Sequence, residues 1–230
     1  MRVCLAQYRS ASDVHTNVSR HREVVKRAAA VLCDVVLFPE LSLTGYRPSV
    51  AAREALPLDA SDFEPLRAAS DELGIVIAAG MPLVAETGVE IGLLVYRPEH
   101  PPASYAKQLL HADEVRFFVP GCRVQDIEAD GIRIAPAICY EAMQPEHGLA
   151  ALSRGASVYA ASTAKTEAGV EQARSYLSDF AARHSVAVLL VNAVGPGDDF
   201  ISGGRSAAWD ASGTLIGELA DEEGELIVDL

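Results

Sequence analysis

Three segments of the sequence place a chemically reactive side chain directly after an apolar run. Glu40 ends the segment 34–40, Lys107 follows Tyr105-Ala106, and Cys139 closes the run that begins at residue 132. Open α/β sheets present their active groups where strands end. A carboxylate at the end of a buried strand is desolvated, which raises its pKa and suits it to proton transfer. A thiol in such a place could face a cleft where backbone N–H groups lower its pKa.

Each of these residues also has an ordinary structural explanation. Glu40 could turn outward and cap its loop, and Cys139 could be an inert thiol in the core, as we expect for Cys4. Lysine is scarce in this chain, whose cations are mostly arginine, yet a lone lysine such as Lys107 is usually solvated. Glu114, seven residues later, could pair with it at the surface, where such a pair contributes little stability. The residues alone leave these alternatives open.

Histidine is the usual base for a cysteine nucleophile, and none of the six histidines has a local context that marks it as catalytic. His111 and His147 stay open as partners of Cys139. The sequence contains no HExxH motif and no Cys/His cluster, so we expect neither a metal site nor a cofactor. The four cysteines are widely spaced without a CxxC pair, which indicates free thiols in a reducing compartment.

The bulk composition excludes several classes of function. The 230 residues carry a formal net charge of −13, and so acidic a surface repels nucleic acids and anionic lipids. The N-terminus lacks the pattern of a secretory signal, and no apolar run is long enough to cross a bilayer. We therefore expect a cytoplasmic protein that binds neither nucleic acid nor membranes. Without repeats or linkers, residues 1–230 are interpreted as a single domain.

Strand-like and helical segments alternate along the chain, which predicts an α/β fold. We expect a helix over 17–32 with Thr16 as its N-cap and Leu32 on its apolar side, and a capping box from Ser61 to Glu64. Further helices are predicted near 146–153 and 168–184. The strands and hairpin-like turns are too numerous for one doubly wound sheet, so two stacked sheets flanked by helices fit better. The predicted strands lie near 3–8, 34–40, 75–84, 91–96, 132–140, 156–162, 186–195, 206–211, 214–219 and 225–230.

Taken in order, the three reactive segments resemble the motifs of the nitrilase superfamily of carbon–nitrogen hydrolases. FPELSLTGY resembles the glutamate motif, YAKQLLHADE with the later FVPG resembles the lysine motif, and ICYEAMQPE resembles the cysteine motif. The resemblance implies Glu40 as general base, Lys107 as stabiliser of the transition state and Cys139 as nucleophile. It also implies that Glu114 helps to position these groups. The implied fold is a four-layer α-β-β-α sandwich assembled into homodimers or larger oligomers.

The resemblance implies hydrolysis of a small amide through a cysteine thioester. The alternatives are hydrolysis of an N-carbamoyl compound, hydrolysis of a nitrile, and a catalytically silent binding module on the same fold. Nitrile-cleaving members typically have Trp after the cysteine, whereas this chain has Tyr140, which favours amides. We expect Tyr46, Phe117, Tyr140 and Thr163 to contact the substrate, which the sequence does not name.

Overall fold

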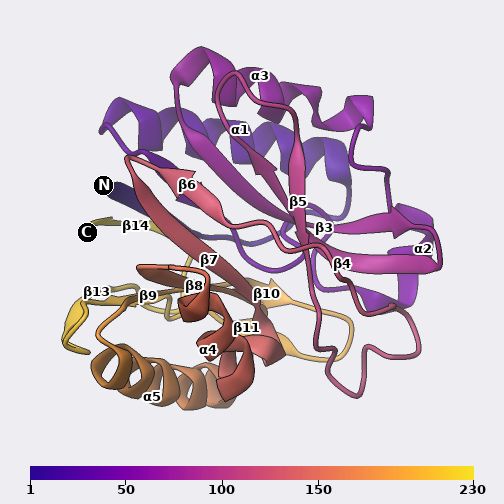
Figure 1. The fold of residues 1–230 in the computed structure, drawn as a ribbon. Coiled ribbons are helices and arrows are strands. Elements are labelled where there is room, and N and C mark those ends of the chain that lie inside the picture. Colours follow the sequence, from indigo (N-terminus) through magenta and orange to yellow (C-terminus); the bar gives the residue numbers. More distant parts are fainter.

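Two six-stranded sheets stack face to face in the computed structural model, which describes all residues 1–230, and helices cover the outer face of each sheet (Figure 1). The first sheet has the strand order β14-β1-β2-β3-β4-β5. Its strands β1, β2 and β3 are parallel, β14 and β4 flank them in antiparallel orientation, and β5 pairs antiparallel with β4. These strands are β1 (Arg2–Gln7), β2 (Val35–Leu37), β3 (Val76–Ala85), β4 (Gly88–Tyr96), β5 (Ala103–Ala106) and β14 (Gly224–Asp229).

The second sheet repeats this arrangement with the order β13-β12-β9-β8-β7-β6. Its central strands β7, β8 and β9 are parallel, with antiparallel strands on both sides. A separate two-stranded ribbon joins β10 to β11. The strands are β6 (Ile127–Ala129), β7 (Ile132–Ile138), β8 (Val158–Thr163), β9 (Ala187–Asn192), β10 (Val194–Pro196), β11 (Ile201–Gly203), β12 (Ala207–Trp209) and β13 (Leu215–Glu218).

The helices divide between the two outer faces, as Figure 1 shows. Helices α1 (Val14–Ala30) and α3 (Glu64–Leu73) cover the first sheet, while α4 (Pro145–Ser153) and α5 (Glu167–His184) cover the second. The short α2 (Ala51–Glu54) lies beside β3. One apolar core fills the space between the sheets. One further core lies between each sheet and the helices that cover it. Strands buried on both faces need continuous apolar runs, which is why β3 is apolar throughout and β8 and β9 are apolar up to their polar last residues. The predicted four-layer sandwich is confirmed.

Three details of the predicted helices are wrong. The first helix begins at Val14, and the side chain of Asp13 caps it by accepting a hydrogen bond from the Thr16 N–H. The chain leaves this helix after Ala30, so Leu32 lies outside it and is 79% exposed. The predicted capping box at Ser61 does not form, because residues 61–63 make a turn of 3₁₀-helix before α3 begins. None of the helices is both long and apolar enough to cross a membrane.

Candidate active site

The end of β2 holds Glu40 in a tight turn against β3. Leu41 has a left-handed φ of +51°, and the neighbouring β3 residue is Gly80. A Cβ atom on Gly80 would lie 2.3 Å from the Leu41 nitrogen, so only glycine lets the two backbones approach this closely. The Ser42 hydroxyl accepts a hydrogen bond from the Gly80 N–H and a second one joins it to buried His21. This turn directs Glu40 into the space between the sheets, where it is 2% exposed.

Lys107 follows β5 and is completely buried. Its ammonium donates hydrogen bonds to Glu40 Oε1 at 2.8 Å and to Glu114 Oε1 at 2.6 Å. Glu114 also accepts hydrogen bonds from the Tyr46 hydroxyl at 2.9 Å and from the His111 N–H at 2.7 Å. The alternative of a solvated Lys107 in a surface pair with Glu114 is therefore wrong. One buried ammonium bridges two buried carboxylates.

Burial raises the pKa of Glu40, and the Glu114 carboxylate raises it further, while Lys107 opposes both effects. For Lys107 burial works against the charged form, yet Glu40, Cys139 and Glu114 outweigh it and raise the pKa above that of a free lysine. Glu40 Oε2 is buried and has no hydrogen-bond partner of regular geometry. The Cys139 thiol is a side-chain neighbour of this carboxylate and lowers its pKa. Glu40 thus has a free oxygen and an elevated proton affinity beside a thiol.

Cys139 lies immediately after β7 and opens a turn of 3₁₀-helix, Cys139–Met143. Its φ of +52° is left-handed, which is unusual for a residue with a side chain and is found mainly at functional sites. Burial and the Glu40 charge raise the pKa of the Cys139 thiol to about 11, against the lowering effect of Lys165 and Lys107. At neutral pH the thiol is therefore protonated, and a base must accept its proton before it can attack.

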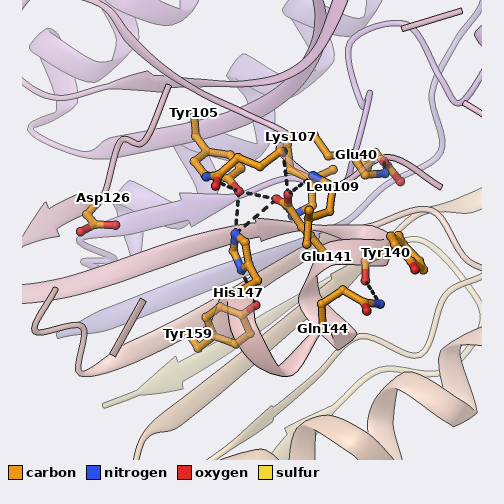
Figure 2. Close-up of polar contacts among 12 residues, drawn as sticks. Glu40, Tyr105, Lys107, Leu109, Asp126, Tyr140, Glu141, Gln144, His147 and Tyr159 are labelled. Atoms are coloured by element: carbon orange, nitrogen blue, oxygen red, sulfur yellow. Dashed lines mark hydrogen bonds and ion pairs between the residues drawn. The ribbon is translucent and has the colours of Figure 1, made fainter. Parts of the chain in front are cut away.

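Glu141, two residues after the thiol, accepts hydrogen bonds from both the cysteine turn and the segment that carries Lys107 (Figure 2). Its carboxylate accepts hydrogen bonds from the N–H groups of Ile138 and Gln108 at 2.8 Å and of Leu109 at 3.2 Å. It also accepts one from the Tyr105 hydroxyl. A single fully buried carboxylate thus connects the cysteine turn to the chain that carries Lys107.

His147 extends this network away from the thiol. Its ring joins the hydroxyls of Tyr105 and Tyr159, each at 2.8 Å, and burial lowers its pKa (Figure 2). His111, the other histidine left open by the sequence, is exposed and packs edge-to-face on Tyr140. Neither ring makes a hydrogen bond with Cys139, whereas the Glu40 carboxylate is a side-chain neighbour of the thiol.

Replacing Glu141 with glutamine should destabilise the protein and slow catalysis without changing substrate affinity. The amide places an N–H₂ group where backbone N–H donors need an acceptor, and each lost hydrogen bond to a charged group costs about 1.5–3 kcal/mol. We expect kcat to fall more than KM changes, because the cysteine turn loses its fixed position relative to Lys107. Thermal unfolding and steady-state kinetics measure both effects. The exposed Glu146→Gln on α4 is the control, and equal behaviour of the two variants would contradict this role.

A cavity of about 530 Å³ opens directly onto Cys139. Of the residues predicted to contact substrate, Tyr46 and Tyr140 line it. Phe117 packs instead against the core between the sheets, and Thr163 is buried with its hydroxyl bonded to Val191 O and Asn192 Oδ1, so neither reaches the cavity. The lining residues are Tyr46, His111, Asp113, Glu114, Cys139, Tyr140, Met143, Gln144, Ala164, Lys165, Thr166, Gly169, Gln172 and Phe200.

Several lining residues have no sequence motif that could have identified them. Phe200 reaches the cavity from the loop before β11 and packs on the Tyr46 ring with the ring centroids 5.2 Å apart. Gln144 comes from the segment between the cysteine turn and α4. Lys165 did carry a signal, because it is one of only three lysines and follows a predicted strand.

Comparison with known proteins places this geometry in a family. The family model described as carbon-nitrogen hydrolase matches residues 2–230. An (R)-stereoselective amidase of Pseudomonas sp. is 26% identical over 220 residues, which cover 95% of this chain and 80% of that protein. A glutamine-dependent NAD(+) synthetase of Thermotoga maritima is 28% identical over 97% of this chain, which spans only 41% of that enzyme.

Solved structures show the same architecture. An amidase from Nesterenkonia AN1, described as a member of the nitrilase superfamily, has a TM-score of 0.90 at 26% identity and covers 100% of this chain and 91% of its own. An alanine variant of that amidase has been solved in complex with butyramide, with a TM-score of 0.88 at 26% identity over 100% of this chain and 90% of that one. Because the family model runs from the first strand to the last and the whole sandwich is shared with a solved relative, this chain belongs to the carbon–nitrogen hydrolase family.

Proposed function

We propose that this protein is an amidase that cleaves small amides through a thioester on Cys139. The observation that carries the proposal is the buried Lys107, which binds Glu40 and Glu114 next to a thiol that faces a cavity. Amidases among its relatives, one of them solved with butyramide, support amides as the substrate class. Glu40, Lys107 and Cys139 are then the catalytic residues, with Glu114 as the positioning carboxylate.

In the first half of the reaction, Glu40 accepts the thiol proton while the Cys139 sulfur attacks the carbonyl carbon of the amide. An ammonium has three donors, and Lys107 uses two of them on Glu40 and Glu114, which leaves one for the developing oxyanion. The backbone N–H of Tyr140 is the second donor that we propose. The C–N bond breaks as protonated Glu40 gives its proton to the leaving nitrogen, which departs as ammonia.

In the second half, the Glu40 carboxylate removes a proton from water, and the resulting hydroxide attacks the thioester carbonyl. The C–S bond breaks, the carboxylic acid leaves, and Cys139 regains its proton from Glu40. One amide and one water are consumed, and one acid and one ammonia are formed. A single proton passes between Glu40 and its partners in both halves, which fits a carboxylate whose pKa is raised by burial.

Replacing Glu40 with glutamine should remove activity while leaving the fold intact. General-base catalysis contributes about 10²- to 10⁴-fold, so we expect a loss of that size in kcat/KM. In the wild type, the raised pKa of Glu40 moves the acid limb of the pH–rate profile above the range of an ordinary glutamate. Ammonia release across pH measures both effects.

Relative to the wild type, the same variant should become more stable as pH rises. A group whose pKa is raised by folding contributes stability below its unfolded pKa and loses it as pH rises through the folded value. Glu40→Gln removes this loss and leaves Lys107 paired with Glu114 alone. Its melting temperature should therefore match the wild type in acid and exceed it at neutral pH. Glu90→Gln, which removes a buried carboxylate paired with Arg123 outside the site, is the control and should lower the melting temperature at neutral pH rather than raise it.

The alternatives make different predictions for products. A nitrile hydrolase would cleave nitriles in preference to the corresponding amides, an N-carbamoyl hydrolase would act only on carbamoyl compounds, and a silent binding module would release no ammonia from any of them. Incubation with matched amides, nitriles and carbamoyl compounds separates these functions.

The homo-oligomer expected from the family resemblance also stays a prediction, and light scattering in solution tests it.

A further inference from the structure

Lys165 is a cation in the wall of the catalytic cavity that has no partner in the protein. It follows β8 and lines the same cavity as Cys139. The other two lysines are both paired, Lys26 with Glu23 at 2.7 Å and Lys107 with its two carboxylates. No carboxylate lies within 4.0 Å of the Lys165 ammonium, which donates no hydrogen bond either. Its side chain is partly buried, so solvent only partly replaces a missing partner.

Buried polar groups hold the backbone of Lys165 in place. The side-chain amide of Asn192 accepts a hydrogen bond from the Lys165 N–H at 2.8 Å and donates one to its C=O at 3.1 Å. The Gly203 N–H donates to the same carbonyl at 2.9 Å. Asn192 is completely buried at the end of β9, so an interior amide holds both backbone polar groups of this loop residue.

The Gly204-x-Ser206 segment in turn holds Asn192. The Gly204 carbonyl accepts from Asn192 Nδ2 at 2.8 Å, and the Ser206 hydroxyl accepts from the Asn192 N–H at 2.9 Å. The Ser206 hydroxyl donates to Gln7 Oε1 from β1 at 2.8 Å. Residues of both sheets therefore hold the backbone of Lys165, and its side chain extends from a fixed position.

The charge of Lys165 acts directly on the reacting group. Among the cations around Cys139, Lys165 lowers the pKa of the thiol the most, ahead of Lys107. The acid nearest to it in sequence is Glu167, which lines a different cavity together with Arg9. In a protein of net charge −13, this ammonium beside the nucleophile has no carboxylate within 4.0 Å, although Asp113 and Glu114 line the same cavity.

We propose that Lys165 binds a carboxylate of the substrate, so that the natural substrates are small amides that also carry a carboxylate, such as half-amides of dicarboxylic acids. This inference rests on the proposed amidase function and adds the substrate class. A partly desolvated ammonium is stabilised by an anion, and a substrate bound in the same cavity can supply one. With the amide carbon at Cys139, the carboxylate binds at Lys165 and fixes the orientation of the amide.

The test compares amides that differ only in charge. The half-amides of malonic, succinic and glutaric acid are each assayed against the corresponding neutral diamide. The wild type should prefer at least one half-amide. Lys165→Met should lower kcat/KM for that half-amide about 10- to 100-fold, mainly through KM, because a hydrogen bond to a charged group is lost. Activity on the diamide should fall less, and through kcat rather than KM, because loss of the Lys165 charge raises the pKa of the Cys139 thiol whichever amide is bound.

Two further variants complete the comparison. Lys165→Arg keeps the charge and should retain most of the preference for the half-amide. Lys26→Met removes a lysine on the outer helix α1 and should leave both activities unchanged. An equal fall on half-amide and diamide in Lys165→Met would overturn the proposal, because it would place Lys165 on the thiol or the oxyanion. A wild type without preference for any half-amide would overturn it as well.

Failure of the amidase function itself would look different, since no amide of either kind would release ammonia. Binding then decides the question of the carboxylate. Calorimetric titration of succinamate into Cys139→Ala and into the double variant Cys139→Ala/Lys165→Met compares affinities without turnover. Binding that weakens about 10- to 100-fold without Lys165 supports the carboxylate site. Equal binding, or none, overturns it.

Discussion

Replacing Cys139 with alanine should abolish amide hydrolysis, with kcat falling by about 10⁴-fold or more. Alanine leaves the cavity open and Glu40 paired with Lys107, so the protein should still fold and bind amides. Serine should fare little better, because an alcohol is far harder to deprotonate than a thiol whose pKa is about 11. Ammonia release from a panel of small amides measures the loss.

Cys122→Ala is the matched control for this experiment. Cys122 is the exposed cysteine of the chain, whereas Cys4 and Cys33 are buried and burial raises the pKa of both thiols. Its removal should leave turnover unchanged. A mass-spectrometric search for an acyl adduct should find it on Cys139 alone. Full activity in Cys139→Ala would refute the thioester mechanism outright.

Replacing Lys107 with methionine should damage both activity and stability. Methionine fills a similar volume but leaves Glu40 and Glu114 as buried carboxylates without their shared cation. Removal of one partner from a buried ion pair costs about 3–5 kcal/mol, which lowers the melting temperature of a domain this size by about 6–20 °C. Loss of the proposed oxyanion donor should lower kcat by a further 10²- to 10³-fold, roughly.

The stability deficit of Lys107→Met should depend on pH in a defined direction. Without the ammonium, burial and the Glu114 charge raise the pKa of Glu40 in the folded state unopposed, so the variant is least stable at high pH and recovers as Glu40 becomes protonated. Thermal melts at several pH values measure this. The additional change Glu114→Gln should restore part of the stability, while Lys26→Met should have no effect. A melting temperature equal to that of the wild type at pH 8 would show that the buried trio is not a charged network.

The apolar patterns predicted the architecture because burial on both faces forces continuous apolar strands, and both sheets contain such strands. The helix ends were less predictable. Asp13 and Thr16 can both cap a helix, and the sequence does not show that Asn17 binds the backbone at Ala11 and draws the first turn back to Val14.

Site residues were predictable where a strand ends and unpredictable where a loop folds back. Glu40 and Cys139 follow strands, so their places could be predicted from apolar runs. Thr163, which was predicted to contact substrate, does not line the cavity, because the strand is still buried there and the cavity begins one residue later. Lysine is scarce in this chain, which singled out Lys107 as a candidate, and the same reasoning applies to Lys165. The position of Phe200 in the cavity wall depends on how its loop packs against Tyr46, far away in the sequence, and no local sequence pattern predicts that contact.

The pairing of β1 with β14 has a consequence for the synthesis of this protein. Gln7 lies opposite Gly224, so the first strand of the chain must wait for nearly the last one to complete its sheet. At about 5–20 residues per second, a ribosome needs roughly 10–45 s to make the chain between them. During that interval the nascent protein displays an apolar strand with one unpaired edge, the kind of edge through which chains aggregate. The rate of translation and the time at which residues 224–229 emerge therefore set how long each new molecule is exposed to that hazard.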